Sequence, residues 1–181
     1  MNLWHDVSIG KNVPEEFNCI VEVPKGSLNK YEIDKESGLI ALDRANYSAA
    51  PYPFEYAFVP QTLWDDGDAL DVVIIATAPI AVGVLVAVRP IALMDMTDSG
   101  ESDVKIIAVP VADKRFEDIH DLADLNKHML KEFQHFFETY KMLKSDDPKK
   151  YLVTIAGYKG KAEAIAAINK SRELYKQKFS K

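Results

Sequence analysis

The sequence contains a single cysteine, Cys19, among 181 residues. One thiol cannot form an intramolecular disulfide, and a metal site of the Cys-x-x-Cys type is excluded as well. A free cysteine usually behaves as a small buried hydrophobe and is typical of a reducing compartment. We therefore expect a buried, unreactive thiol in a cytoplasmic protein.

An excess of positive charge is also missing, because 28 acidic residues outnumber 22 basic ones and give a net charge of −6. This balance argues against bulk electrostatic capture of nucleic acid, while allowing a small anion held by local bases or through metals. The longest uncharged run, 72–88, is shorter than the roughly 20 residues that span a membrane, and it contains Pro79 and Gly83. The first residues lack the basic and apolar regions of a secretory signal. We expect neither nucleic acid nor membrane as a partner.

Strand patterns fill the first two-thirds of the chain. Short apolar or alternating runs bounded by turn residues predict strands at 18–23, 30–34, 39–42, 72–76, 84–94 and 104–109. The run 72–88 is expected to hold two buried strands joined by a turn near Pro79. The segment 51–56 is expected to be a rigid turn.

The last third of the sequence is predicted to be helical. Apolar residues recur at three- and four-residue spacing from Leu125 to Tyr140, and a looser pattern covers 162–179. Asp121 and Asp124 are expected near the start of the first helix and Lys141 and Lys144 near its end, as the helix dipole favours.

Strands followed by helices predict an α+β fold with a mainly β core. A five-stranded β-barrel of the oligonucleotide/oligosaccharide-binding (OB) type, packed by C-terminal helices, is one such arrangement. No repeat or flexible linker interrupts the chain, so residues 1–181 are expected to form a single domain.

Two acidic loops contain the densest chemical pattern. The first, 65–71, has four aspartates in seven residues. Carboxylates this close raise one another's pKa unless a cation lies among them, and hard divalent cations bind such oxygen ligands. A solvated acidic turn explains this loop alone equally well. A second acidic loop, 97–103, also leads into a strand. Together the two loops predict a multi-metal site of the kind that hydrolyses phosphate esters and anhydrides. Its expected ligands are Asp66, Asp71, Asp98 and Asp103.

Basic and tyrosine side chains are present for an anion to bind. Arg44 is the strongest candidate, because a guanidinium can hold a phosphate with two parallel hydrogen bonds. A solvated surface charge is the commoner role for any single base, and core packing is at least as common for a tyrosine. The remaining candidates are Lys30, Lys105, Lys141, Tyr47, Tyr52 and Tyr56.

Several familiar sites are excluded by their spacing. The loop starting at Asp66 is not an EF-hand, because Asp71 stands at the sixth position and Thr77 at the twelfth. No phosphate-binding loop of the Walker A type, Gly-x-Ser-x-Gly motif or His-Glu-x-x-His motif occurs. His128 and His135 lie seven residues apart on the predicted helix and are expected to be buried or at an interface.

Two other classes of function remain open. An OB-like barrel can bind a nucleotide or single-stranded nucleic acid through tyrosines and bases, although the low basicity and the acidic loops argue against it. A structural calcium-binding domain would need the acidic loops but not the basic residues.

At this point the motifs resemble those of the family I soluble inorganic pyrophosphatases of the bacterial type, over nearly the whole length. The most specific element is the family motif Asp-x-Asp-Pro-x-Asp, seen here as Asp66-Gly67-Asp68-Ala69-Leu70-Asp71. The order and spacing of further motifs agree, namely Val21-Glu22-Val23-Pro24, Lys30-Tyr31-Glu32-Ile33-Asp34-Lys35, Asp43-Arg44, Tyr52-Pro53 with Tyr56, Met96-Thr97-Asp98 with Asp103 and Lys105, and His135-Phe136-Phe137-Glu138 with Tyr140-Lys141.

The resemblance implies Mg²⁺-dependent hydrolysis of inorganic pyrophosphate to two phosphates by a metal-activated water, with several Mg²⁺ ions in each active site. It implies metal ligation by the four aspartates named above, with Glu22 and Glu32 close to the ions and Lys105 among the acids. Asp68 resembles the group that accepts the proton of the attacking water. Phosphate binding is implied for Lys30, Arg44, Tyr56, Tyr140 and Lys141, with Tyr52 in support, and relatives are commonly hexamers.

The sequence departs from the family pattern at a few positions. Ala69 replaces the proline of the motif, which should loosen the loop. Glu55 and Ala57 flank Tyr56 in place of asparagine and glycine, and Glu55 is expected to add a carboxylate near the site. Ser99 replaces an often acidic residue, and Tyr158 follows Gly157 where tryptophan is usual.

Overall fold

The computed structural model describes residues 1–147 and 149–179. Its strands are β1 (Phe17–Val23), β2 (Asn29–Ile33), β3 (Ile40–Ala45), β4 (Glu55–Phe58), β5 (Asp71–Ile74), β6 (Leu85–Asp98), β7 (Glu101–Ser102), β8 (Lys105–Pro110) and β9 (Val153–Lys159). The α-helices are α1 (Lys127–Thr139) and α2 (Lys161–Phe179), and short 3-10 helices are η1 (Lys114–Phe116), η2 (Leu122–Asp124) and η3 (Met142–Lys144).

Five of the strands pair in a closed ring. The order is β1-β4-β5-β8-β6, and β6 pairs with β1 to complete the circuit. All neighbours are antiparallel except β5 and β8, which are parallel. Closed pairing leaves few unpaired edges. The prediction of an α+β fold built on a five-stranded OB-like barrel is confirmed.

The long strand β6 makes this closure possible. Its first residues pair with β1, its middle pairs with β8, and its last residues pair with β9 and β7. The register with β8 shifts between Pro90 and Ala92, where proline removes a donor from the ladder. A strand that bends in this way can join two parts of a barrel wall.

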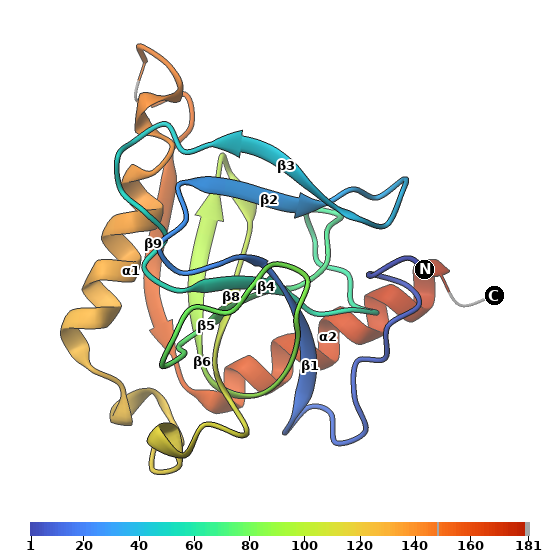
Figure 1. Cartoon of the computed structure of the whole chain (residues 1–181). Coiled ribbons are helices and arrows are strands. Elements are labelled where there is room, and N and C mark those ends of the chain that lie inside the picture. Colours follow the sequence, from blue (N-terminus) through green and yellow to red (C-terminus); the bar gives the residue numbers. More distant parts are fainter. Residues whose placement is uncertain (148, 180–181) are drawn as a thin grey trace.

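The two α-helices and a separate hairpin surround the barrel. In Figure 1, α1 lies along β9, α2 crosses beneath the barrel, and the β2–β3 hairpin lies above its other end. The apolar face predicted for the first helix is confirmed, because Phe133, Phe136 and Phe137 are buried. No helix within the described ranges has both the length and the apolar character needed to cross a membrane.

Helix α1 begins two residues after the start of its predicted apolar pattern at Leu125, and its first turn contains no acidic residue. Asp121 and Asp124 form a capping box around η2, and the helix begins later, where the Asn126 side chain accepts hydrogen bonds from the N–H groups of His128 and Met129. Asp and Asn side chains compete for the backbone N–H groups, which explains why the 3-10 helix η2 ends before α1 begins. His128 and His135 are both exposed, so burial is excluded for either histidine.

Other differences concern short strands. Residues 55–58 form β4 within a segment that was partly predicted to be a turn, and β9 was not predicted. The link between β5 and β6 occupies 75–84, longer than a turn at Pro79 requires. Val82, Val84 and Leu85 are exposed there, so the apolar run is only partly buried. Cys19 is buried, as expected.

Candidate active site

Nearly all the predicted site residues line one cavity of about 520 Å³. The cavity lies between the β2–β3 hairpin, the loop 65–71, the turn joining β6 to β7, and the end of α1. Its walls include Glu22, Lys30, Glu32, Tyr56, Asp66, Asp68, Asp71, Asp98, Asp103, Lys105, Tyr140 and Lys141. The two acidic loops therefore converge, which distinguishes them from two unrelated surface turns.

Lys105 is the buried centre of the site. It lies opposite Asp71 in the parallel register of β5 and β8, and its Nζ is 2.6 Å from Asp71 Oδ2. It also forms an ion pair with Asp103, and the Tyr56 hydroxyl donates a hydrogen bond to Asp71. Burial lowers the pKa of Lys105, but Asp103 and Asp71 outweigh it, so the pKa is raised. The ammonium stays charged although the residue is only 1% exposed.

The first acidic loop is a tight turn with one end open to water. Trp64 N–H donates to the Asp68 carbonyl at 2.7 Å, and the Asp68 N–H donates to Asp66 Oδ1 at 3.0 Å. Gly67 has φ of 87°, a left-handed conformation that disfavours other residues. The Asp68 side chain is 54% exposed and forms an ion pair with Lys35. Asp68 is thus accessible to water beside the more buried Asp71.

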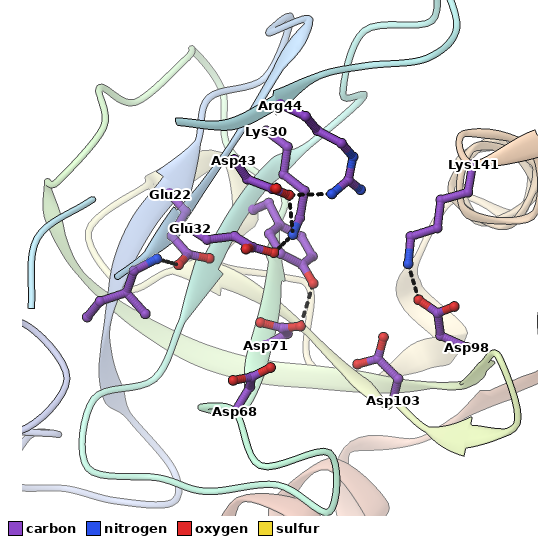
Figure 2. A network of polar contacts seen from close by, with 12 residues as sticks. Glu22, Lys30, Glu32, Asp43, Arg44, Asp68, Asp71, Asp98, Asp103 and Lys141 are labelled. Atoms are coloured by element: carbon purple, nitrogen blue, oxygen red, sulfur yellow. Dashed lines mark hydrogen bonds and ion pairs between the residues drawn. The ribbon is translucent and has the colours of Figure 1, made fainter. Parts of the chain in front are cut away.

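The second acidic loop is the β6–β7 turn. Ser99 and Gly100 both have positive φ, which reverses the chain and brings Asp98 and Asp103 to the same cavity. Asp98 forms an ion pair with Lys141 after the end of α1. Burial raises the Asp98 pKa, but the hydrogen bond and charge of Lys141, with the Ser99 hydrogen bond and the Lys105 charge, together outweigh burial, so the pKa is lowered. This pair connects the acidic turn to the helical side of the molecule, at the right of Figure 2.

The pKa is raised for three other carboxylates of the site. Burial, followed by the charge of Asp71, raises the pKa of Glu22 to about 8, despite a hydrogen bond of 2.7 Å from the Ile33 N–H. Burial and nearby carboxylates, including Asp103, raise the pKa of Asp66 to about 6. Burial first, with Asp71 adding to it, also raises the pKa of Asp103. Added divalent cations would relieve this repulsion, so the donor set fits hard metal ions.

These acids are not gathered tightly around one point. Within residues 1–147 and 149–179, no three His, Cys, Asp or Glu side chains form a compact metal-binding group. Figure 2 shows Asp68, Asp71 and Asp103 spread across the floor of the site, between Glu22 and Glu32 on one side and Asp98 on the other. Such spacing suits several ions that share ligands better than one closed cage.

The hairpin contributes the opposite charge. Lys30 and Arg44 face each other in the β2–β3 register, and both contact Asp43. Burial lowers the pKa of Lys30, and the charge of Arg44 lowers it further. Arg44 Nη2 is buried and has no hydrogen-bond partner in the described part of the chain. Arg44 lies outside the residues that line the cavity, so only its neighbour Lys30 reaches the wall directly.

Two tyrosines and one glutamate lie outside the cavity wall. Tyr52 is 1% exposed and packs against Phe136 with ring centroids 4.7 Å apart, so Tyr52 is a core residue and not part of the cavity wall. Tyr47 also lies outside the cavity wall. Glu55 was expected near the site, and this expectation was wrong. Its carboxylate is buried and accepts a hydrogen bond from the Lys25 N–H at 2.8 Å, outside the cavity.

Sequence reasoning missed several residues of the wall. Lys35 was recognised only as part of a motif, yet it binds Asp68. Glu101, Lys144, Tyr151 and Trp4 also line the cavity. Glu101 lies three residues after Asp98 and Lys144 follows a helix end, and neither position indicates where the side chain points. Trp4 is far from the loops in sequence. Only Lys35 could have been found, because it follows Lys30 in the same hairpin.

The comparisons with known proteins agree on one family. The family model described as inorganic pyrophosphatase matches residues 19–176. The inorganic pyrophosphatase of Haloferax volcanii is 41% identical over 180 residues, covering 99% of this chain and 99% of the relative. The soluble inorganic pyrophosphatase 1 of Arabidopsis thaliana is 42% identical over 172 residues, covering 95% of this chain and 79% of the relative.

A solved structure shows the same similarity in three dimensions. The crystal structure of inorganic pyrophosphatase from Thermus thermophilus superposes with a TM-score of 0.92 at 39% sequence identity. The alignment covers 97% of this chain and 99% of that chain.

Proposed function

The chain belongs to the family I soluble inorganic pyrophosphatases, and on this premise we propose how its cavity hydrolyses pyrophosphate. The protein is a hydrolase that splits inorganic pyrophosphate into two phosphates. We propose that the reaction requires Mg²⁺, with several ions in each active site, and that it takes place in the cavity lined by the two acidic loops.

The observation that carries this proposal is that carboxylates and bases line the same cavity. Burial and neighbouring carboxylates raise the pKa of Glu22 and Asp66, so these groups favour added cations. Lys30 and Lys141 line the same cavity, and Arg44, beside Lys30 in the hairpin, has a buried Nη2 without a hydrogen-bond partner in the described part of the chain. A ligand that satisfies both kinds of group brings divalent cations and a polyanion together. Magnesium pyrophosphate has that composition.

The metal-binding role is proposed for Asp66, Asp71, Asp98 and Asp103, with Glu22 and Glu32 close by. Mg²⁺ prefers carboxylates together with waters and substrate phosphate oxygens, which agrees with acids spread over a wide floor. When bound, Mg²⁺ supplies charge that neutralises the phosphate oxygens and lowers the pKa of the attacking water. Lys105 pairs with both Asp71 and Asp103, which orients the two carboxylates in the cavity wall.

The other residues move a proton and hold the anion. We propose Asp68 as the proton acceptor, because its half-exposed carboxylate lies beside Asp71 at the open end of the loop. Lys30, Arg44 and Lys141 would hold phosphate oxygens and stabilise charge on the departing phosphate. Tyr56 and Tyr140 are buried in the wall with raised pKa, chiefly because of burial, so their hydroxyls stay protonated and can donate hydrogen bonds.

We further propose that residues 1–181 act as one domain, in the cytoplasm and without nucleic acid or membrane partners. A homohexamer is proposed from the family, with the exposed His135 on α1 as a candidate for a subunit contact.

Phosphate release separates this function from a binding role. The protein should release two phosphates per pyrophosphate with Mg²⁺, and should give no catalysis with single-stranded oligonucleotide in place of pyrophosphate. An oligonucleotide bound tightly without any pyrophosphate turnover would contradict the proposal and favour a binding module.

A further inference from the structure

The N-terminal segment, Asn2–Asp6, is ordered against the active site although it lies outside every strand and α-helix. Asn2 holds it in a turn, because its Oδ1 accepts hydrogen bonds from the N–H groups of Trp4 at 2.9 Å and His5 at 3.1 Å. Trp4 is 4% exposed and lines the cavity. The proposed chemistry assigns this side chain no role.

Hydrogen bonds connect Trp4 to the end of the first acidic loop. Its indole Nε1 donates to the Thr62 carbonyl at 2.8 Å, and Thr62 Oγ1 accepts a hydrogen bond from the Leu70 N–H at 3.0 Å. Thr62 and Leu70 are both 0% exposed, so water cannot readily replace either bond. Leu70 immediately precedes Asp71. The indole therefore acts, through one intermediate residue, on the backbone from which Asp71 projects.

Packing adds to this connection. The Trp4 ring belongs to a buried cluster with Ile20, Phe58, Leu63 and Ala69. Ala69 lies within the acidic loop, between Asp68 and Asp71. A ring packed under the loop limits how far its backbone can shift, because interiors are close-packed.

The same segment also contacts the β2–β3 hairpin. Leu3 N–H donates to the Gly38 carbonyl at 3.1 Å. Gly38 has φ of 72°, and a Cβ atom there would lie 2.6 Å from Asn2 Cα, so the two backbones touch. The hairpin turn carries Lys35, which pairs with Asp68 across the site. The N-terminal segment thus joins the two walls that hold Asp68, Asp71 and Lys35.

We propose that Trp4 is a positioning residue for pyrophosphate hydrolysis, which holds the acidic loop in register with the hairpin through Thr62. This inference rests on the proposed function. It predicts that losing the indole N–H disturbs metal binding and turnover while the barrel stays folded.

Trp4→Phe tests the inference, because it removes the Nε1 donor and keeps most of the ring. With pyrophosphate as substrate, kcat at saturating Mg²⁺ should fall about ten-fold, within the range that small misplacements of catalytic groups produce. The Mg²⁺ concentration that gives half the maximal rate should rise several-fold. A purely structural role would lower the melting temperature and leave both quantities unchanged at 25 °C.

Tyr175→Phe is the matched control. The Tyr175 hydroxyl lies 2.7 Å from His5 Nδ1, on the side of the segment that faces α2, so this change also removes one aromatic hydrogen-bonding group. It should leave kcat and the Mg²⁺ dependence at wild-type values. Thr62→Val removes the acceptor for Leu70 and should reproduce the effect of Trp4→Phe, and it carries the test if Trp4→Phe does not fold.

Three results would overturn the inference: wild-type kcat and Mg²⁺ dependence in both Trp4→Phe and Thr62→Val, the same losses in Tyr175→Phe, or neither test variant folding. An inactive wild-type protein would instead refute the proposed function, and the inference with it.

Discussion

Replacing Lys105 with methionine tests the electrostatic structure of the site. Methionine has nearly the length of the lysine stem, so the main change is the loss of the ammonium group. That group lies 2.6 Å from Asp71 Oδ2 and pairs with Asp103, and the lysine side chain is only 2% exposed. Lys105→Met therefore leaves two carboxylates close together without their cation.

Removing one partner of a buried ion pair typically costs about 3–5 kcal/mol, because the remaining charge is uncompensated. Asp71 and Asp103 keep side-chain exposures of 21% and 16%, so we expect the lower end of that range. A loss of about 3 kcal/mol corresponds to a fall in melting temperature of about 6–12 °C for a chain of this size. The loss should shrink at acidic pH, where protonated carboxylates no longer repel.

The assay is thermal unfolding of metal-free protein at pH 7, followed by circular dichroism. The matched control is Lys114→Met, because Lys114 pairs with Glu117 at 3.3 Å with its side chain 90% exposed. Exposed ion pairs contribute little to stability, so this control should have the same melting temperature as the wild type. Adding Mg²⁺ should raise the melting temperature of Lys105→Met more than that of wild type. A metal-free Lys105→Met protein as stable as wild type at pH 7 would show that the ammonium does not stabilise the two carboxylates.

Three further predictions concern the acids and the assembly. Asp68→Asn should lower kcat by about 10²–10⁴-fold with a smaller loss of Mg²⁺ affinity, whereas Asp71→Asn should lower both kcat and Mg²⁺ affinity. Calorimetric Mg²⁺ titration and pH–rate profiles measure the two effects, and near-normal turnover in Asp68→Asn would contradict the proposed role of Asp68. The Glu22 pKa is raised from 4.5 to about 8 in the folded protein, so folding favours the neutral carboxyl and the stability of the metal-free protein should fall as the pH rises from about 5 to 8. Glu22→Gln should reduce this fall in stability, and an equal pH dependence in both proteins would contradict the prediction. Sedimentation at neutral pH should show a hexamer, and a monomer at micromolar concentration would remove the proposed contact at His135.

The barrel was largely predictable because its strands are apolar in unbroken runs. Strand β1 is buried at nearly every position, and Pro24 marks its end. Strand β9 was missed because it is largely exposed or half-exposed and is interrupted by Gly157, which has φ of 144°. A strand whose partner is distant in sequence has little local pattern of its own, and its stability comes from pairing with β6.

The composition of the site was easier to predict than its internal pairing. The convergence of Asp71 and Asp103 in one cavity followed from two acidic loops that each adjoin a buried strand. Their shared partner Lys105 depends on the parallel register of β5 and β8, which no local pattern reveals. Trp4 reaches the loop only through the folded N-terminal segment. Contacts between residues far apart in the sequence cannot be predicted from residue propensity and motif spacing.

We propose that pyrophosphate is hydrolysed in this cavity by means of divalent ions held by its acidic loops. The most direct test measures phosphate release from pyrophosphate after chelator treatment. Mg²⁺ is then titrated back into the wild type and, in parallel, into Asp71→Asn. We expect no release without metal, recovery with Mg²⁺ in the wild type, and a shift to much higher Mg²⁺ with a lower maximum in Asp71→Asn. Metal-independent release by the wild type, or an unchanged titration in Asp71→Asn, would contradict it.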